Sequence, residues 1–257
     1  MRKPTKCFKG VLVGVLLCSG ANRQGQATSK KKPTYACPVV VEHLHVATYS
    51  GDMPVDHYQF AGIHSRGTVF ALHSAAGILT TPTEVFDDIG QFALACAGFD
   101  VYLPHYLATS GVASVPNVKF AQEHAAEWLR DLRQVFASVV SDQRPSFLVG
   151  DSLGGYLALA LQPTIKGVRG ISLIAVGYTG LEPYELPTRL PVLDQLGTQD
   201  ELVSLQQGRL LVSALRKKQC LVKSIEYQGV GHNLLLERRQ SVINAMLSSM
   251  ISLLPKR

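Results

Sequence analysis

A serine between two glycines is the feature of this sequence with the clearest chemical potential. Ser152 lies in the segment 150–154, Gly-Asp-Ser-Leu-Gly, which follows an apolar run at 146–149 and precedes Tyr-Leu-Ala-Leu-Ala, a good helix former. A strand, Gly-x-Ser-x-Gly and a helix in this order expose a serine hydroxyl on a sharp turn. Glycines flank such a turn because a Cβ there would collide with the neighbouring strand or helix. We therefore predict that Ser152 is a nucleophile.

A serine hydroxyl is a weak nucleophile and needs a base, which itself needs a carboxylate to orient it. His232, the one histidine after Ser152, lies in the glycine-rich segment 229–233, before the last helical pattern. Two carboxylates on one strand–loop unit are candidates: Asp194 within the predicted strand and Asp200 beyond its end. Because active sites of open α/β sheets lie at the carboxyl ends of the strands, we predict Asp200 and keep Asp194 as the alternative.

A third segment with chemical potential follows the apolar run 68–73, which predicts a buried strand. That run ends in the small residues of segment 74–77, Ser-Ala-Ala-Gly. Small residues at a strand exit let backbone N–H groups face an open site, where they could stabilise a developing oxyanion. An ordinary strand–helix turn is the alternative interpretation.

The elements that must position these residues alternate between strand and helix patterns. Apolar and β-branched runs predict strands at 37–49, 57–63, 68–73, 99–104, 146–149, 168–176, 190–196 and 220–227. Helical spacing predicts helices at 83–97, with Thr83 as N-cap and Gly98 as the stop, and at 117–140, 201–217 and 238–253. We therefore predict an α/β fold: a mostly parallel, doubly wound sheet with helices on both faces and an N-terminal antiparallel hairpin around the turn 50–54.

The N-terminal residues predict export. Residues 1–21 combine a basic start, an apolar run and small residues at a cleavage site, as a signal peptide does, and 22–35 resemble a flexible basic linker. The remainder, 36–257, is predicted as a single domain without a stable transmembrane segment. Lipidation at Cys18 and a cytosolic protein with an irregular start are the alternatives.

Charge and cysteine content exclude several classes of function. The net charge is +6, but eight basic residues precede residue 36, so the rest is close to neutral and nucleic-acid binding is not expected.

Cys37, Cys96 and Cys220 remain after signal cleavage. One disulfide is possible, with Cys37 as a candidate, whereas Cys96 and Cys220 are predicted as buried thiols. No metal-ligand spacing is present, so we expect neither a metal nor a cofactor.

These motifs together resemble the dienelactone hydrolase family of α/β-hydrolases. The resemblance runs from about residue 68 to the C-terminus and rests on segments 72–77, 98–104, 150–154, 197–200 and 229–232. It implies the α/β-hydrolase fold and hydrolysis of small carboxylic esters or lactones through an acyl-enzyme. Ser152 would attack, His232 would act as base and Asp200 would orient it. By position, the backbone N–H groups of Leu153 and Ala75 would form the oxyanion hole.

The sequence departs from the founding members of that family at two positions. They use a cysteine nucleophile and a glutamate before the oxyanion turn, where this chain has Ser152 and Ser74. It therefore resembles the serine-bearing branch, whose substrates are diverse. Asp151 is also unusual, because a carboxylate beside the nucleophile disfavours a developing oxyanion. Gly-Asp-Ser-Leu matches the signature of another esterase family, but that family requires Asp-x-x-His near its C-terminus, which this chain lacks.

Two rival functions remain open at this level. A peptidase or acyltransferase could use the same three residues, although the interval 177–189 leaves room only for a small cap. A non-catalytic binding protein could share the fold. Seven histidines precede Ser152, and none is assigned a chemical role. Of these, His43, His45 and His57 are expected to be structural or exposed, and His73 and His105 to lie at strand exits near the site.

Overall fold

The computed structural model describes residues 37–61, 65–78, 80–81, 84–85, 89–140, 143–180, 182 and 184–255. The predicted signal peptide 1–21, which includes Cys18, and the predicted linker 22–35 lie outside these residues. Within the described ranges, no helix combines the length and the apolar character that crossing a bilayer requires.

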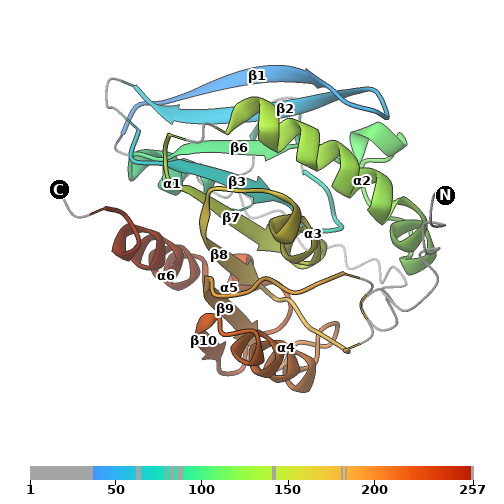
Figure 1. Cartoon of the computed structure of the whole chain (residues 1–257), viewed down its shortest axis with the longest axis vertical. Coiled ribbons are helices and arrows are strands. Elements are labelled where there is room, and N and C mark those ends of the chain that lie inside the picture. The colour runs from blue at the N-terminus through green and yellow to red at the C-terminus, as the bar shows by residue number, and fades with distance from the viewer. Residues whose placement is uncertain are drawn as a thin grey trace, which may run out of the picture.

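One eight-stranded sheet forms the centre of the fold, in the order β1-β2-β6-β3-β7-β8-β9-β10 (Figure 1). β1 pairs with β2, and β2 with β6, in antiparallel fashion, and all the other pairs are parallel. The strands are β1 Val39–Ala47, β2 Asp52–Phe60, β3 Thr68–Leu72, β6 Asp100–Pro104, β7 Ser146–Asp151, β8 Val168–Ile174, β9 Pro191–Gly197 and β10 Leu221–Tyr227. A separate two-stranded sheet joins β4 Thr80–Thr81 to β5 Glu84–Val85. The predicted sheet and its antiparallel hairpin are confirmed. The second strand of the hairpin, predicted at 57–63, begins earlier, because Asp52–Pro54 of the predicted turn already pair with β1.

Helices cover both faces of the sheet (Figure 1). They are α1 Gln91–Cys96, α2 Val118–Val139, α3 Leu153–Leu161, α4 Leu205–Lys217, α5 Leu234–Glu237 and α6 Arg239–Ser252, with 3-10 turns η1 Ala108–Ser110 and η2 Gln162–Thr164. The core on one face contains side chains of α2, α3 and α4, and the core on the other contains side chains of α1, α5 and α6. The central strand β3 is buried along its whole length, which explains its continuous apolar run.

The helix predicted at 83–97 is wrong in its first half. Glu84–Val85 forms β5, and α1 begins only at Gln91, with Gly90 rather than Thr83 at its N-cap. Gly90 has φ 78°, which interrupts helical backbone, and a Cβ there would press on Ile243 of α6. The predicted stop is confirmed, because Gly98 follows the helix with φ 88°.

The start of the helix predicted at 201–217 also differs. α4 begins at Leu205, where Ser204 and Gln207 form a capping box, so Glu201 is not its first residue. The Asp200 carboxylate accepts the N–H groups of Leu202 and Val203, both at 2.8 Å, and these bonds hold the chain in a turn before the helix.

Cys37 and Cys96 form a disulfide, so the prediction of Cys96 as a free thiol is wrong. Cys37 precedes β1 and Cys96 ends α1, and α1 packs beside β1 and β2, which brings the two Cα atoms to 5.8 Å. Because the two cysteines are 59 residues apart, no local pattern in the sequence indicates this contact. The prediction for Cys220 is confirmed: it is buried and free, and its Sγ donates to the carbonyl of Pro187.

Candidate active site

The turn between β7 and α3 holds Ser152 in a strained conformation. Its φ of 50° and ψ of −113° lie in a region that residues with a Cβ rarely adopt. A Cβ on Gly150 would collide with the backbone of Gly154 and Gly155. A Cβ on Gly154 would collide with the carbonyl oxygens that end β3. The two glycines therefore allow β3, β7 and α3 to meet at the carboxyl end of the sheet, with Ser152 at the junction.

Hydrogen bonds link the three predicted catalytic side chains in series. His232 Nε2 lies 3.0 Å from Ser152 Oγ, and His232 Nδ1 lies 2.8 Å from Asp200 Oδ2. The Asp200 side chain is fully buried, and 16% of the His232 side chain is exposed. An ionised carboxylate only accepts hydrogen bonds, so the imidazole carries its proton on Nδ1 and presents an unprotonated Nε2 to the serine hydroxyl. This arrangement can take a proton from Ser152.

Asp194, the alternative acid, lies elsewhere. It is buried inside β9, where its Oδ2 accepts the Ser224 hydroxyl at 2.9 Å and its Oδ1 has no partner among the described residues. Burial raises the pKa of the Asp194 carboxyl to about 7. Of the two carboxylates left open by the sequence, the structure brings Asp200 to His232.

The loops that follow β9 and β10 are bonded to each other, which positions Asp200 and His232. The N–H of Gln199 donates to the Val230 carbonyl at 2.9 Å, and the N–H of Gly229 donates to Thr198 Oγ1 at 2.9 Å. A Cβ on Gly197 would collide with the carbonyl oxygen of Val230. The acid and the base therefore belong to one packed unit, although 32 residues separate them.

Two backbone N–H groups near Ser152 lack an acceptor within the described part of the chain. Leu153 is the first residue of α3, so its N–H has no partner inside the helix and lies at the positive end of the helix dipole. Ala75 follows β3, and its N–H also makes no hydrogen bond with a described residue. Because Gly154 contacts the carbonyls of Leu72 and His73, these two segments lie against each other.

Three histidines of the first half of the chain, His43, His45 and His105, form hydrogen bonds with aspartates. Asp56 accepts bonds from His43 Nδ1 at 2.7 Å and from His105 Nε2 at 2.9 Å. Burial acts to raise the pKa of Asp56, but the bonds from His105 and His43 outweigh it and lower that pKa. His45 lies 2.6 Å from Asp52, and its side chain is mostly exposed.

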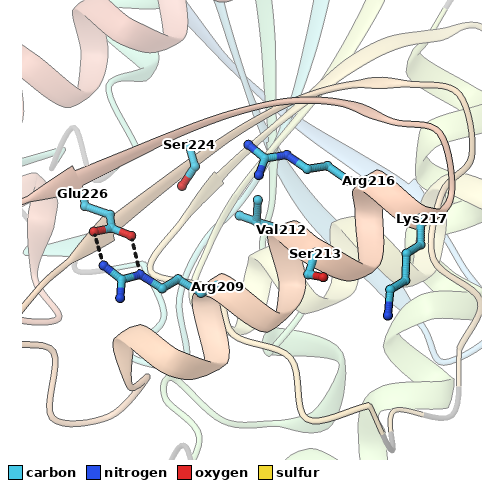
Figure 2. Close-up of a pocket in the computed structure, with 7 residues that line it drawn as sticks. All are labelled: Arg209, Val212, Ser213, Arg216, Lys217, Ser224 and Glu226. Carbon is cyan, nitrogen blue, oxygen red and sulfur yellow. Dashed lines mark hydrogen bonds and ion pairs between the residues drawn. The ribbon is translucent and has the colours of Figure 1, made fainter.

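One surface cavity of about 840 Å³ lies between α4 and β10 (Figure 2). It is lined by Arg209, Val212, Ser213, Arg216, Lys217, Ser224 and Glu226, and Arg209 and Glu226 form a bidentate ion pair across it. None of the five predicted site residues lines this cavity. Across the described ranges, no group of three or more His, Cys, Asp or Glu side chains is placed to hold a metal ion.

The sheet order, the strained serine turn and the residues that follow β7, β9 and β10 together define the α/β-hydrolase fold. Solved structures with this fold are similar to the chain over most of their length. A putative dienelactone hydrolase from Klebsiella pneumoniae is 16% identical, with a TM-score of 0.64, over 84% of this chain and 98% of that one. A dienelactone hydrolase-like promiscuous phosphotriesterase from metagenomic libraries is 14% identical, with a TM-score of 0.63, over 84% of this chain and 99% of that one.

A third similar structure is an α/β serine hydrolase without a lid from Xanthomonas campestris. It is 15% identical, with a TM-score of 0.62, over 84% of this chain and 96% of that chain. No protein-family model matches the sequence, and no curated protein is significantly similar to it. The resemblance to the dienelactone hydrolase family is thus supported at the level of the fold, and ester hydrolases are prominent among the similar structures.

Proposed function

We propose that this protein is a serine hydrolase that cleaves small carboxylic esters or lactones through an acyl-enzyme. The observation that carries the proposal is the hydrogen-bonded series of Ser152, His232 and Asp200. It is supported by the N–H groups of Leu153 and Ala75, which have no acceptor among the described residues. A nucleophile, a base, an orienting acid and an oxyanion site are the parts that acyl transfer requires.

The reaction proceeds in two halves. Ser152 Oγ attacks the substrate carbonyl carbon while His232 Nε2 accepts the hydroxyl proton, and Asp200 stabilises the resulting imidazolium. The N–H groups of Leu153 and Ala75 bind the oxyanion of the tetrahedral intermediate. His232 then protonates the leaving alcohol, which leaves an acyl-enzyme on Ser152. Water, activated by His232, attacks that ester and releases the acid and the free serine.

The location of the protein in the cell is part of the proposal. We infer export, with residues 1–21 as signal peptide, 22–35 as linker and 36–257 as one catalytic domain; lipidation at Cys18 is the alternative form of the mature protein. The Cys37–Cys96 disulfide supports export because disulfides persist in oxidising compartments such as the periplasm or the exterior.

The first experiment measures hydrolysis of short- and medium-chain p-nitrophenyl esters by the mature protein and four variants. Ser152→Ala and His232→Ala are each expected to lower kcat by roughly a thousandfold or more, because each removes a member of the catalytic unit. Asp200→Asn should lower kcat by roughly a hundredfold to ten-thousandfold, since His232 loses its orienting carboxylate. Asp194→Asn is the matched control and should leave kcat unchanged.

Labelling with a fluorophosphonate separates the possible failures. No turnover and no labelling of Ser152 would overturn the hydrolase proposal and favour a non-catalytic binding protein. Labelling without ester turnover would favour a peptidase or acyltransferase that uses the same residues. Equal losses in Asp200→Asn and Asp194→Asn would refute the assignment of Asp200.

A further inference from the structure

The orientation of the Ala75 N–H depends on the residue before it. The N–H of Ala75 and the C=O of Ser74 belong to the same peptide group, which is trans because no described peptide bond is cis. In a planar trans peptide these two groups point in opposite directions. Whatever holds the Ser74 oxygen therefore also determines where the Ala75 N–H points.

The Ser74 oxygen is held from two sides. It accepts a bond from His73 Nδ1 at 2.8 Å and another from the N–H of Gly77 at 3.1 Å. Because a carbonyl only accepts hydrogen bonds, Nδ1 of His73 must carry a proton. Burial lowers the pKa of the His73 imidazole to about 4, so the ring donates this bond as a neutral imidazole near neutral pH.

The His73 ring is itself fixed by its neighbours. It is 1% exposed and stacks on Tyr106, with ring centroids 4.2 Å apart and an interplanar angle of 8°. The Tyr106 hydroxyl donates to the His73 carbonyl at 2.8 Å, so one residue holds both the ring and the backbone of His73. Tyr106 in turn packs edge-on against the buried Trp128. These contacts leave the imidazole little freedom to turn away from Ser74.

The other side of the turn is also anchored. The Ala75 carbonyl accepts the N–H of Val115 at 2.8 Å, and the N–H of Ala76 donates to Ser74 Oγ at 3.3 Å. A Cβ on Gly77 would collide with the carbonyl of Ala113, which places the end of the turn against the segment after η1. The neighbouring polar groups of the turn are thus occupied, whereas the Ala75 N–H has no acceptor among the described residues.

We infer that His73 is a positioning residue for the oxyanion hole: its Nδ1–H holds the Ser74 carbonyl and thereby directs the Ala75 N–H toward the oxygen of the reacting carbonyl. This inference rests on the proposed function and adds a residue to it. His73 contacts no reacting atom, so its effect is on the geometry of a donor. Small displacements of groups that stabilise a transition state cost roughly up to a hundredfold in rate.

The test compares two substitutions of nearly equal size. His73→Asn places an amide N–H donor close to the position of Nδ1. His73→Leu introduces a side chain that branches at the same atom as asparagine but has no hydrogen-bond donor. His73→Leu should lower kcat by roughly tenfold to a hundredfold with KM changed less than about twofold, because only the transition state uses the hole fully. His73→Asn should recover most of kcat. Inhibition by an arylboronic acid, which forms a tetrahedral adduct on Ser152, should weaken in parallel with kcat/KM.

His57→Leu is the matched control. His57 is also buried and stacks on a tyrosine, Tyr102, with ring centroids 4.2 Å apart and an interplanar angle of 3°. It lies on β2, and its Nδ1 is 3.3 Å from Glu42 Oε2 on β1. Its loss should lower thermal stability without changing kcat. If His73→Leu does not fold, His73→Gln takes its place: the glutamine amide lies near the Nε2 position, so it should lose activity where His73→Asn keeps it.

The outcomes separate this inference from the proposed function. Equal kcat for the wild type and His73→Leu, or equal losses in His73→Asn and His73→Leu, would overturn the role of His73 while leaving the hydrolase proposal intact. A loss of kcat in His57→Leu as large as in His73→Leu would assign the effect to lost packing and also overturn it. A wild type that neither turns over esters nor reacts with fluorophosphonate would overturn both.

Discussion

At the scale of single residues, two aspartates only six positions apart have opposite environments. Asp200 lies in a loop, where it accepts bonds from His232, Leu202 and Val203. These donors stabilise a negative charge on the Asp200 carboxylate, which is what the proposed role of Asp200 beside His232 requires. Asp194 lies in the middle of β9 and receives one hydrogen bond, from the Ser224 hydroxyl, within the described part of the chain. The same side chain is thus suited to orienting a histidine at one position and to remaining protonated at the other.

The raised pKa of Asp194 predicts a pH-dependent loss of stability. The carboxyl has a pKa of about 7 in the folded protein and about 3.8 when unfolded, so the folded state binds more protons between these values. Its contribution to the free energy of unfolding therefore falls as pH rises from about 4 to about 7, by up to about 4 kcal/mol, and stays low above that range. Asp194→Asn should remove this part of the pH dependence.

Urea denaturation at pH 4.5 and pH 8 measures this effect in the wild type, in Asp194→Asn and in Asp52→Asn. The Asp52 side chain is 61% exposed, so its substitution controls for the loss of a surface carboxylate. Asp194→Asn should increase the free energy of unfolding relative to the wild type, and this increase should be larger at pH 8 than at pH 4.5. A wild type and an Asp194→Asn variant with parallel pH profiles would show that Asp194 is ionised in the folded state.

At the scale of secondary structure, the close packing of β3, β7 and α3 brings the turn at Ser152 against the end of β3. Gly154 is where α3 touches the end of β3, and Gly155 is where α3 touches Val176 beyond β8. These contacts leave no room for a side chain. The glycines of the serine turn therefore serve packing between elements as well as the conformation of the turn itself.

Gly154→Ala should be strongly destabilising, since its Cβ would overlap backbone carbonyl oxygens that cannot move independently of β3. We expect a loss of about 3 kcal/mol or more in the free energy of unfolding, and a fall in kcat as α3 shifts from β3. Gly111→Ala is the control: Gly111 has φ 69° but open space around it, so only the left-handed backbone costs energy, about 1 kcal/mol. Chemical denaturation of both variants measures the difference, and equal losses would contradict the packing argument.

At the scale of the whole molecule, the Cys37–Cys96 disulfide ties the edge hairpin to the helix beside it. β1 is the last strand on its side of the sheet and pairs only with β2 among the described strands. An edge strand with one partner opens more easily than a central strand. The disulfide joins Cys37, just before β1, to Cys96, at the end of α1, and it therefore limits the opening of β1.

Removal of the disulfide should lower the free energy of unfolding. The bond closes a loop of about 60 residues and so restricts the conformations of the unfolded chain. Cys37→Ser with Cys96→Ser is expected to cost about 2–4 kcal/mol and to lower Tm by roughly 5–15 °C. Cys220→Ser changes a buried thiol outside the disulfide and serves as control. Reductant should lower the Tm of the wild type but leave that of the double variant unchanged. A wild-type Tm insensitive to reductant would contradict a stabilising role for the bond.

The sequence by itself determined the features that depend on neighbouring residues. The apolar runs predicted β3, β7 and β8, because strands buried on both faces require continuous apolar side chains. The glycines around Ser152 predicted the sharp turn, because only residues without a Cβ fit there. Chain order and the carboxyl-end rule favoured Asp200 and His232, since parallel strands bring their carboxyl ends to one edge.

Only the tertiary structure decided what depends on contacts between distant segments. It placed Cys96 against Cys37 and started α1 at Gln91, because the packing of α1 on β1, β2 and α6 overrides the local helical pattern of 83–97. It also brought Tyr106 onto His73, a contact between two strand exits that lie 33 residues apart. Local sequence determines which backbone conformations are low in free energy. The choice among them depends on contacts between surfaces that meet only after the sheet has formed.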